Sequence, residues 1–186
     1  NVIALLLISS PLASESANAR GGLYHVSDFG AKGDGQTLET AALQRSIDAC
    51  HLGGGGRVLV TPGKYLTAGL QLKANVTLEI SAGATLLGST QRDDYAVRAV
   101  IQCADQNNVA ITGRGVIDGQ GGHPVFKPDN VYNGLPGRPY LIHAFGGAHL
   151  KVQGVTLRNA ATWAFRCDEY QDVVIDDLKI HSRVNA

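Results

Sequence analysis

The 186-residue sequence contains no methionine and one tryptophan, and aromatic residues make up only 6% of it. So few large side chains disfavour a helical bundle. Net charge is also absent, because 16 basic residues balance 16 acidic ones, so nothing indicates binding to nucleic acid or to an anionic membrane. Glycine is abundant instead, with 23 residues, which is typical of folds with many tight corners.

The missing methionine leads us to expect that the natural start of the chain is lacking. Residues 1–19 fit this expectation, since the apolar run Val2–Ile8 is followed by the small-residue pattern Ala17-Asn18-Ala19. This order is typical of a secretory signal remnant, and the run is too short to span a bilayer. We therefore expect a secreted or periplasmic protein without membrane contact after signal cleavage. An apolar first strand is the alternative interpretation.

Three cysteines, Cys50, Cys103 and Cys167, lie far apart in the chain. Their odd number and wide spacing match neither a disulfide framework nor a metal site. We expect them to be small buried hydrophobic residues, and we predict no metal and no cofactor.

One short pattern occurs twice near the end of the chain, in residues 150–159 and 173–182. A shift of 23 residues aligns four apolar positions, pairing Leu150 with Val173, Val152 with Ile175, Val155 with Leu178, and Leu157 with Ile180. Apolar and polar residues alternate within each copy, as they do in strands, and break step once at a corner. A repeat of this length built from short strands predicts a solenoid whose coils stack on one another.

Corner residues support the same interpretation. Asn75, Asn108 and Asp172 each stand directly before a valine that opens a strand-like stretch. Asn and Asp accept a positive φ angle more readily than most residues, so we expect left-handed corners at these three positions.

One amphipathic helix is predicted at about residues 38–51, with Leu43, Ile47 and Cys50 on its apolar face. We expect Thr37 or Thr40 to cap its start. Placed ahead of a stack of coils, such a helix can cover the open N-terminal end of the stack.

Residues 119–139 interrupt the strand pattern with several prolines and glycines, which predicts a loop insertion. It either walls a groove beside the stack or is a mere variation in length. The chain stops at Ala186 without a closing helix, so we also expect the solenoid to be truncated at its C-terminal end.

Four stretches near the N-terminus are motifs: Phe29–Gly35 (FGAKGDG), Ala41–Ile47 (AALQRSI), the run Gly53–Gly56, and Val60–Leu66 (VTPGKYL). With Gly113–Gly119 (GRGVIDG), they resemble the N-terminal signature of pectin-degrading β-helix proteins, a signature that lyases and phage tailspikes share. Three later motifs, Arg138–Ile142 (RPYLI), Val155–Asn159 (VTLRN) and Thr162-Trp163, narrow the resemblance to polygalacturonases, family 28 of the glycoside hydrolases. The resemblance runs from about Val26 to Ala186.

This resemblance implies an all-β fold, a right-handed single-stranded parallel β-helix, and inverting hydrolysis of α-1,4 bonds in galacturonan. Inversion needs one carboxylic acid for the leaving oxygen and a carboxylate that activates water on the opposite face. The family's catalytic aspartates would fall after Ala186, so we assign no catalytic residue in this chain. Asp176-Asp177 is an acidic pair, but its place before Leu178 predicts a solvated corner.

The strand that contains Trp163 to Asp168 should lie on the same sheet as the absent motif, one coil earlier. Strand alternation places Phe165 and Cys167 inward if Arg166 faces outward, and Trp163 then also packs inward. Arg166 is suited to bind a uronate carboxylate, although pairing with Asp168 or Glu169 is an equal alternative. His143 and Arg183 are weaker candidates for substrate binding, as is Trp163 through stacking on a sugar.

Three functions remain open. The first is a hydrolase that acts on an acidic polysaccharide, pectin or galacturonan, as a monomer and without nucleic acid. The second is a polysaccharide lyase on the same solenoid, which would need clustered carboxylates for Ca²⁺, whereas the groove strand offers only Asp168 and Glu169. The third is a non-catalytic carbohydrate-binding β-helix like that of tailspikes.

Overall fold

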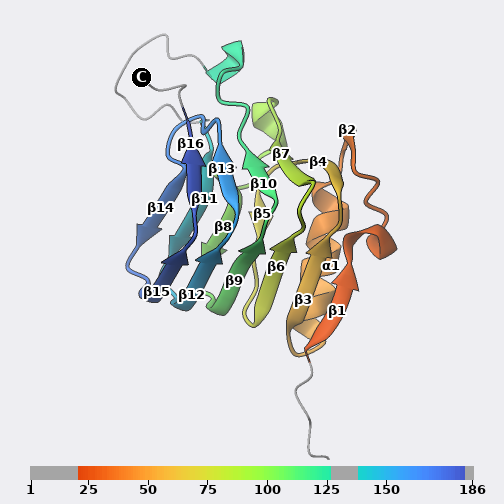
Figure 1. The fold of residues 1–186 in the computed structure, drawn as a ribbon, viewed down its shortest axis with the longest axis vertical. Helices are drawn as coiled ribbons and strands as arrows, with labels where there is room; N and C mark the ends of the chain where they lie inside the picture. The colour runs from red at the N-terminus through yellow and green to blue at the C-terminus, as the bar shows by residue number, and fades with distance from the viewer. Residues whose placement is uncertain (1–20, 127–137, 183–186) are drawn as a thin grey trace, which may run out of the picture.

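A computed structural model describes residues 21–126 and 138–182 of the chain. Short strands follow one another around a solenoid and form three parallel sheets (Figure 1). Sheet 1 has the order β1-β3-β6-β9-β12-β15, sheet 2 the order β2-β4-β7-β10-β13-β16, and sheet 3 the order β5-β8-β11-β14. Each of the four middle coils contributes a strand to every sheet, and the first and last described coils contribute to sheets 1 and 2 alone. Every described strand pair is parallel. The predicted parallel β-helix is confirmed.

The strands are short, as the sequence repeat predicts. Sheet 1 consists of β1 (Gly22–His25), β3 (Gly56–Val60), β6 (Val76–Ile80), β9 (Asn107–Gly113), β12 (Ala148–Gln153) and β15 (Gln171–Asp176). Sheet 2 consists of β2 (Asp34–Leu38), β4 (Gly63–Thr67), β7 (Ala84–Gly88), β10 (Val116–Asp118), β13 (Thr156–Arg158) and β16 (Lys179–His181). Sheet 3 consists of β5 (Leu70–Gln71), β8 (Ala99–Ala104), β11 (Tyr140–Phe145) and β14 (Phe165–Asp168). Three 3₁₀ turns accompany them: η1 (Val26–Phe29), η2 (Arg92–Asp94) and η3 (Pro124–Phe126).

Columns of aliphatic side chains fill the interior of the solenoid. In sheet 1 the parallel register stacks Val58, Leu78, Ile111, Val152 and Ile175. The first four are fully buried, whereas Ile175 on the last described rung is 48% exposed. Full burial of one such side chain stabilises the fold by about 1.5–3 kcal/mol, so each coil depends on the coil stacked above it.

The 23-residue repeat corresponds to two adjacent coils. Leu150 pairs with Val173 and Val152 with Ile175 between β12 and β15. Leu157 pairs with Ile180 between β13 and β16. The pairing register is therefore the one that the sequence alignment predicts.

The three predicted left-handed corners are also confirmed. The φ angle is 64° at Asn75, 56° at Asn108 and 52° at Asp172, and the side chain of Asn108 donates a hydrogen bond of 3.1 Å to that of Asn75. A second column of corners contains Gly113, with φ 112°. A Cβ atom there would approach the carbonyl oxygen of Ile80 to 2.1 Å, so the stacked coils leave no room for a side chain.

The helix α1 (Thr40–Leu52) lies at the N-terminal end of the stack and packs against β1, β3, β5, β6 and η1 (Figure 1). Its buried face contains Leu43, Ile47 and Cys50, as predicted. It also closes the edge of sheet 3, because the side-chain amide of Gln44 accepts from the backbone N–H of Gln71 (2.9 Å) and donates to its carbonyl (3.0 Å). The predicted capping helix is confirmed, with its start two residues later than expected.

The predicted threonine cap is wrong. The residue before the helix is Glu39, and no side-chain hydrogen bond caps the start. Thr40 instead accepts a hydrogen bond from the backbone N–H of Ala68 (2.9 Å), and the hydroxyl of Thr37 donates to Asp34 (2.7 Å). The hydroxyl of Thr40 thus joins the helix to the residue after β4, whereas that of Thr37 bonds within β2.

The loop insertion predicted at residues 119–139 falls between β10 and β11, and only part of it lies within the described residues. Phe126 in η3 is buried at its near end, and residues 127–137 lie outside the described residues. The same holds for the predicted signal remnant, residues 1–19, and for Arg183. Within residues 21–126 and 138–182, we find no helix that has both the length and the apolar character needed to cross a membrane.

Candidate functional site

Sheet 3 carries a column of polar side chains on its outer face, one from each coil. The parallel register places Gln71, Gln102, His143 and Arg166 side by side on β5, β8, β11 and β14. Their neighbours along the strands, such as Ile142 and Ala144, are fully buried, so the column faces outward. Adjacent members lie one strand spacing apart, about 4.8 Å.

Arg166 and His143 meet at one carboxylate oxygen. Nε of Arg166 donates to Oδ2 of Asp168 at 2.6 Å, and Nε2 of His143 lies 3.1 Å from the same oxygen. The hydrogen bond from Arg166 lowers the pKa of Asp168 below its ordinary value of 3.8, with a smaller contribution from His143. The hydrogen bonds to Asp168 and Tyr140 raise the pKa of Arg166, so the pair is ionised at neutral pH.

Aromatic rings support this cluster. The Tyr140 hydroxyl accepts a hydrogen bond of 2.9 Å from Nη1 of Arg166, and its ring centroid lies 5.0 Å from that of His143. The His143 ring in turn lies 4.8 Å from the ring of Phe145. Packed rings restrict the motion of the polar groups between them, which prepares these groups to bind a ligand.

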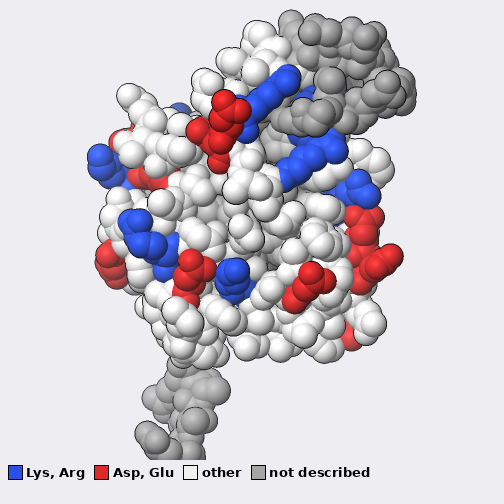
Figure 2. All heavy atoms as spheres, turned by 180° about the vertical axis from the view of Figure 1, so that it is seen from behind, with Lys and Arg blue, Asp and Glu red and all other residues white. Residues whose placement is uncertain are grey.

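An open hollow of about 510 Å³ adjoins the cluster. His143, Phe145, Arg166 and Asp168 line it, together with Asp105 and Glu169. Figure 2 views the molecule from behind, the side on which sheet 3 lies in Figure 1. Basic side chains gather there beside the grey segment, and acidic side chains adjoin them.

The sequence offered two interpretations of Arg166, binding of a uronate carboxylate and pairing with Asp168 or Glu169, and this arrangement is compatible with both. Its ion pair with Asp168 is present, and its side chain remains 41% exposed beside the hollow. His143 lies in the same cluster, with a side chain that is 16% exposed. Whether either residue binds substrate stays a prediction.

The expectation that Trp163 packs inward is wrong, since 61% of its surface is exposed. The strand β14 begins at Phe165, and Trp163 belongs to the turn before it. Strand periodicity does not extend into a turn. Its carbonyl still accepts a hydrogen bond from the backbone N–H of Leu141 (3.1 Å), which holds the turn beside sheet 3.

Cys167 also differs from the prediction. Cys50 and Cys103 are buried as expected, but Cys167 is exposed. Its register partner on β11 is Ala144, which pairs with the buried Cys103, so its side chain does point inward. It is exposed because β14 is the last described strand of sheet 3.

Sequence reasoning missed Tyr140, Phe145 and Arg98 as members of the site. The guanidinium carbon of Arg98 lies 5.0 Å from the centroid of the Tyr140 ring. The register between β11 and β14 could have indicated Phe145, because aligning these two strands places Phe145 beside Asp168.

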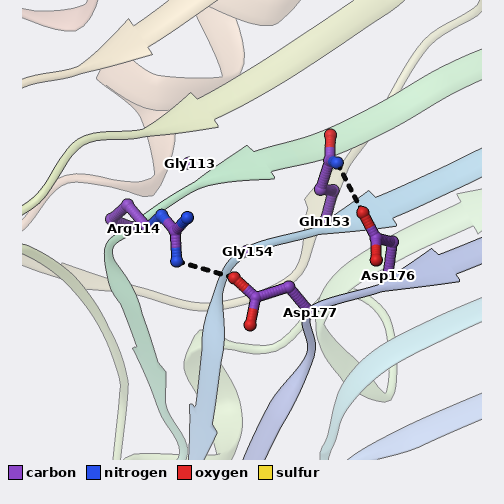
Figure 3. Close-up of a pocket in the computed structure, with 6 residues that line it drawn as sticks. All are labelled: Gly113, Arg114, Gln153, Gly154, Asp176 and Asp177. Atoms are coloured by element: carbon purple, nitrogen blue, oxygen red, sulfur yellow. Dashed lines mark hydrogen bonds and ion pairs between the residues drawn. The ribbon is translucent and has the colours of Figure 1, made fainter.

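A second hollow, of about 310 Å³, lies at the corner between sheets 1 and 2 (Figure 3). Here Arg114 donates to Asp177 (2.6 Å) and Gln153 to Asp176 (2.7 Å), while Lys179 donates to Asp177 (2.8 Å). The bond from Lys179 and the charges of both cations lower the pKa of Asp177. The pair Asp176-Asp177 is therefore a solvated corner, as predicted, in which two cations pair with Asp177 and a neutral amide donates to Asp176.

In the part of the chain that the structure describes, no three His, Cys, Asp or Glu side chains are placed so that they could hold a metal ion together. Asp168 and Glu169 remain the carboxylates that β14 and its turn bring to the hollow.

The family model for Glycosyl hydrolases family 28 matches residues 55–186. The chain belongs to this family. It is 39% identical over 120 residues to an exo-poly-alpha-D-galacturonosidase of Dickeya chrysanthemi, a match that covers 53% of this chain and 20% of that protein. It is 32% identical over 156 residues to Alginate lyase 7 of Azotobacter vinelandii, covering 76% of this chain and 17% of that protein.

Solved structures agree with the family. The family 28 exopolygalacturonase of Yersinia enterocolitica superposes with a TM-score of 0.73 at 29% identity, over 90% of this chain and 40% of that one. The matched part of the present chain spans about a fifth of the length of the two curated relatives from Dickeya chrysanthemi and Azotobacter vinelandii.

Proposed function

We propose that the protein to which this chain belongs hydrolyses α-1,4-galacturonosyl bonds of pectin with inversion. Family membership and the similarity to an exo-poly-alpha-D-galacturonosidase support this activity. We further propose that the catalytic acid and base follow Ala186. The protein would act as a secreted or periplasmic monomer.

The observation that carries the proposal is the Arg166 guanidinium on the outer face of sheet 3, beside the open hollow. Galacturonan presents one carboxylate per sugar, and a polymer of this kind needs positive groups along its binding surface. Arg166 provides such a group, fixed by Asp168 and Tyr140 and still accessible from the hollow. A guanidinium binds carboxylates through two parallel N–H donors.

The test uses the complete protein encoded by the gene, with polygalacturonate as substrate. Release of reducing ends, with the first product detected by NMR as the anomer opposite to the substrate linkage, is the expected result. The isolated 186-residue chain should give no turnover, since it would lack the acid and base. Turnover by this short chain would overturn the proposed location of the catalytic residues.

A polysaccharide lyase is the second candidate, because the chain is also similar to Alginate lyase 7. A lyase breaks the same kind of bond by β-elimination and leaves an unsaturated uronate, which absorbs ultraviolet light. A hydrolase adds water and creates no such chromophore. Reducing ends without ultraviolet absorbance therefore favour hydrolysis, and reducing ends with it favour elimination. Binding without either product would indicate a non-catalytic β-helix.

A further inference from the structure

Two arginines approach the ring of Tyr140 from the coils on either side of it. The guanidinium carbon of Arg98, which precedes β8, lies 5.0 Å from the ring centroid, and that of Arg166 on β14 lies 5.5 Å from it. The two positive charges are therefore no more than 10.5 Å apart, the sum of these distances. Tyr140 itself is only 6% exposed, so it forms a fixed support for both.

The charges of the two arginines are balanced differently. Arg166 forms an ion pair with Asp168. Arg98 donates from Nε to the backbone carbonyl of Arg138 (3.1 Å), a neutral group. Within residues 21–126 and 138–182, no carboxylate forms an ion pair with Arg98. Among the described residues, the charge of Arg98 is thus not balanced by an ion pair of its own.

The geometry also leaves Arg98 able to bind. Its Nε is occupied by the Arg138 carbonyl, which fixes the plane of the guanidinium, and one face rests on the Tyr140 ring. The side chain is partly exposed. The two terminal nitrogens are the groups that form bidentate pairs with planar anions, and a guanidinium held in place loses less entropy on binding.

We propose that Arg98 binds an anionic group of the polysaccharide, with Tyr140 as its support, as a second acidic-sugar site beside Arg166. This inference rests on the proposed function, because it specifies which residue recognises the charge of the substrate. A uronate carboxylate and a sulfate ester on a galactan present the same chemistry to a guanidinium. Arg98 therefore recognises the negative charge of the polymer and not the type of sugar in its backbone.

The test compares Arg98→Gln with Arg57→Gln in the complete protein. Arg57 lies on sheet 1, where it pairs with Glu79 at 2.9 Å, so its variant loses the same charge on another face. Loss of one charge-assisted contact should raise the KM for polygalacturonate about tenfold or more in Arg98→Gln, with kcat changed by less than about threefold. Arg57→Gln should leave both constants unchanged. An equal response of the two variants would overturn the proposal.

Neutral and sulfated substrates separate the possible ligands. Methyl-esterified pectin has lost its carboxylate charges, so Arg98→Gln should leave its KM unchanged. A tenfold rise for the ester as well would show that Arg98 does not read charge, and would also overturn the proposal. Selective loss of binding to carrageenan, with polygalacturonate unaffected, would assign the site to sulfate instead of carboxylate.

Migration in native gels that contain polygalacturonate or carrageenan separates this inference from the proposed function. If the wild type cleaves neither polymer, the proposed function fails, but retardation that Arg98→Gln abolishes would still support the anion site. If neither polymer retards the wild type, the anion site fails too. Should Arg98→Gln not fold, Arg98→Lys keeps the charge without the planar fork, and an unchanged affinity in that variant would overturn the assignment.

Discussion

Arg166 donates a hydrogen bond of 2.6 Å from Nε to Oδ2 of Asp168, two residues further along the same strand. Residues two apart in a strand point to the same face, so the pair is built into β14 by local geometry. Both side chains are 41% exposed, which means that water screens much of their attraction. The ion pair therefore orients Arg166 more than it stabilises the fold.

A double-mutant cycle tests this statement. Urea unfolding of Arg166→Ala, Asp168→Asn and the double variant should give a small favourable coupling free energy at neutral pH. Because the pKa of Asp168 is lowered in the folded state, the coupling is present above pH 3.8 and is lost as the pH falls below that value. A coupling that persists unchanged in acid would contradict the ion pair.

In contrast to the exposed carboxylate of Asp168, the carboxylate of Asp118 is almost fully buried. It accepts hydrogen bonds from the backbone of Gln120 (3.0 Å), from Nδ2 of Asn159 (3.1 Å) and from Nε of Arg158 (2.9 Å). The bonds from Arg158 and Asn159 join the end of β10 to the end of β13 and the residue after it. Asp118→Asn presents an amide N–H₂ to groups that are themselves donors, so it should lower the free energy of unfolding by about 2–4 kcal/mol.

The matched control for this substitution is Asp177→Asn. Asp177 has similar partners, Arg114 and Lys179, but its side chain is 41% exposed, and Asn tolerates its φ of 48°. Its loss of stability should be clearly smaller than that of Asp118→Asn, because water screens an exposed pair. Equal losses for the two variants would mean that burial does not govern the contribution of Asp118.

Local sequence features predicted much of the fold. The corners at Asn75 and Asn108 depend on the φ preference of one residue, and the register of Val152 with Ile175 depends on a repeat that is visible in the chain. The candidate site depends on contacts between distant residues. Arg98 and the Arg138 carbonyl are 40 residues apart, and Arg166 and the Tyr140 hydroxyl are 26 apart. The strand periodicity of a single sequence does not encode such contacts. The exposure of Trp163 was not predictable from strand alternation either, because this residue lies in a turn.

The reactivity of the Cys167 thiol measures whether another strand covers β14, the last described strand of sheet 3. In the 186-residue chain it should be the one thiol that an alkylating reagent modifies rapidly under native conditions at mildly alkaline pH. Cys50 and Cys103 are buried, and burial raises the pKa of both thiols, to about 12 for Cys103. Burial and Asp168 also raise the pKa of Cys167, so its faster reaction comes from its exposure to the reagent. Mass spectrometry after brief labelling measures the result, and Cys167→Ser should abolish it.

A longer form of the protein gives the complementary result. If a further coil stacks on β14, it covers the position at which Cys167 continues the column of Ala144 and Cys103. Labelling of Cys167 should then become slow, whereas reaction after denaturation should still modify all three thiols. Rapid labelling in the longer protein would show that no coil covers β14.

Asp34 provides a pH-dependent contribution near the N-terminal end. Its carboxylate accepts hydrogen bonds from the backbone of Thr37 (2.8 Å) and Gln36 (2.9 Å) and from the Thr37 hydroxyl (2.7 Å). These bonds lower the pKa of Asp34 from 3.8 to about 2, and the bond from the backbone N–H of Thr37 contributes most. A lowered folded-state pKa means that the contribution is fully present above pH 3.8 and is lost as the pH falls through 2.

Two variants separate the charge of Asp34 from its hydrogen-bonding shape. Asp34→Ala removes the acceptor, and Asp34→Asn keeps one acceptor oxygen that does not titrate. The Tm of the wild type should exceed that of either variant at pH 6, and the excess over Asp34→Asn should shrink as the pH falls from 3.8 toward 2, because the wild-type carboxylate becomes protonated. Carboxyl NMR should give an Asp34 midpoint near 2. A midpoint at 3.8 or above would show that the Thr37 and Gln36 bonds do not favour the ionised form.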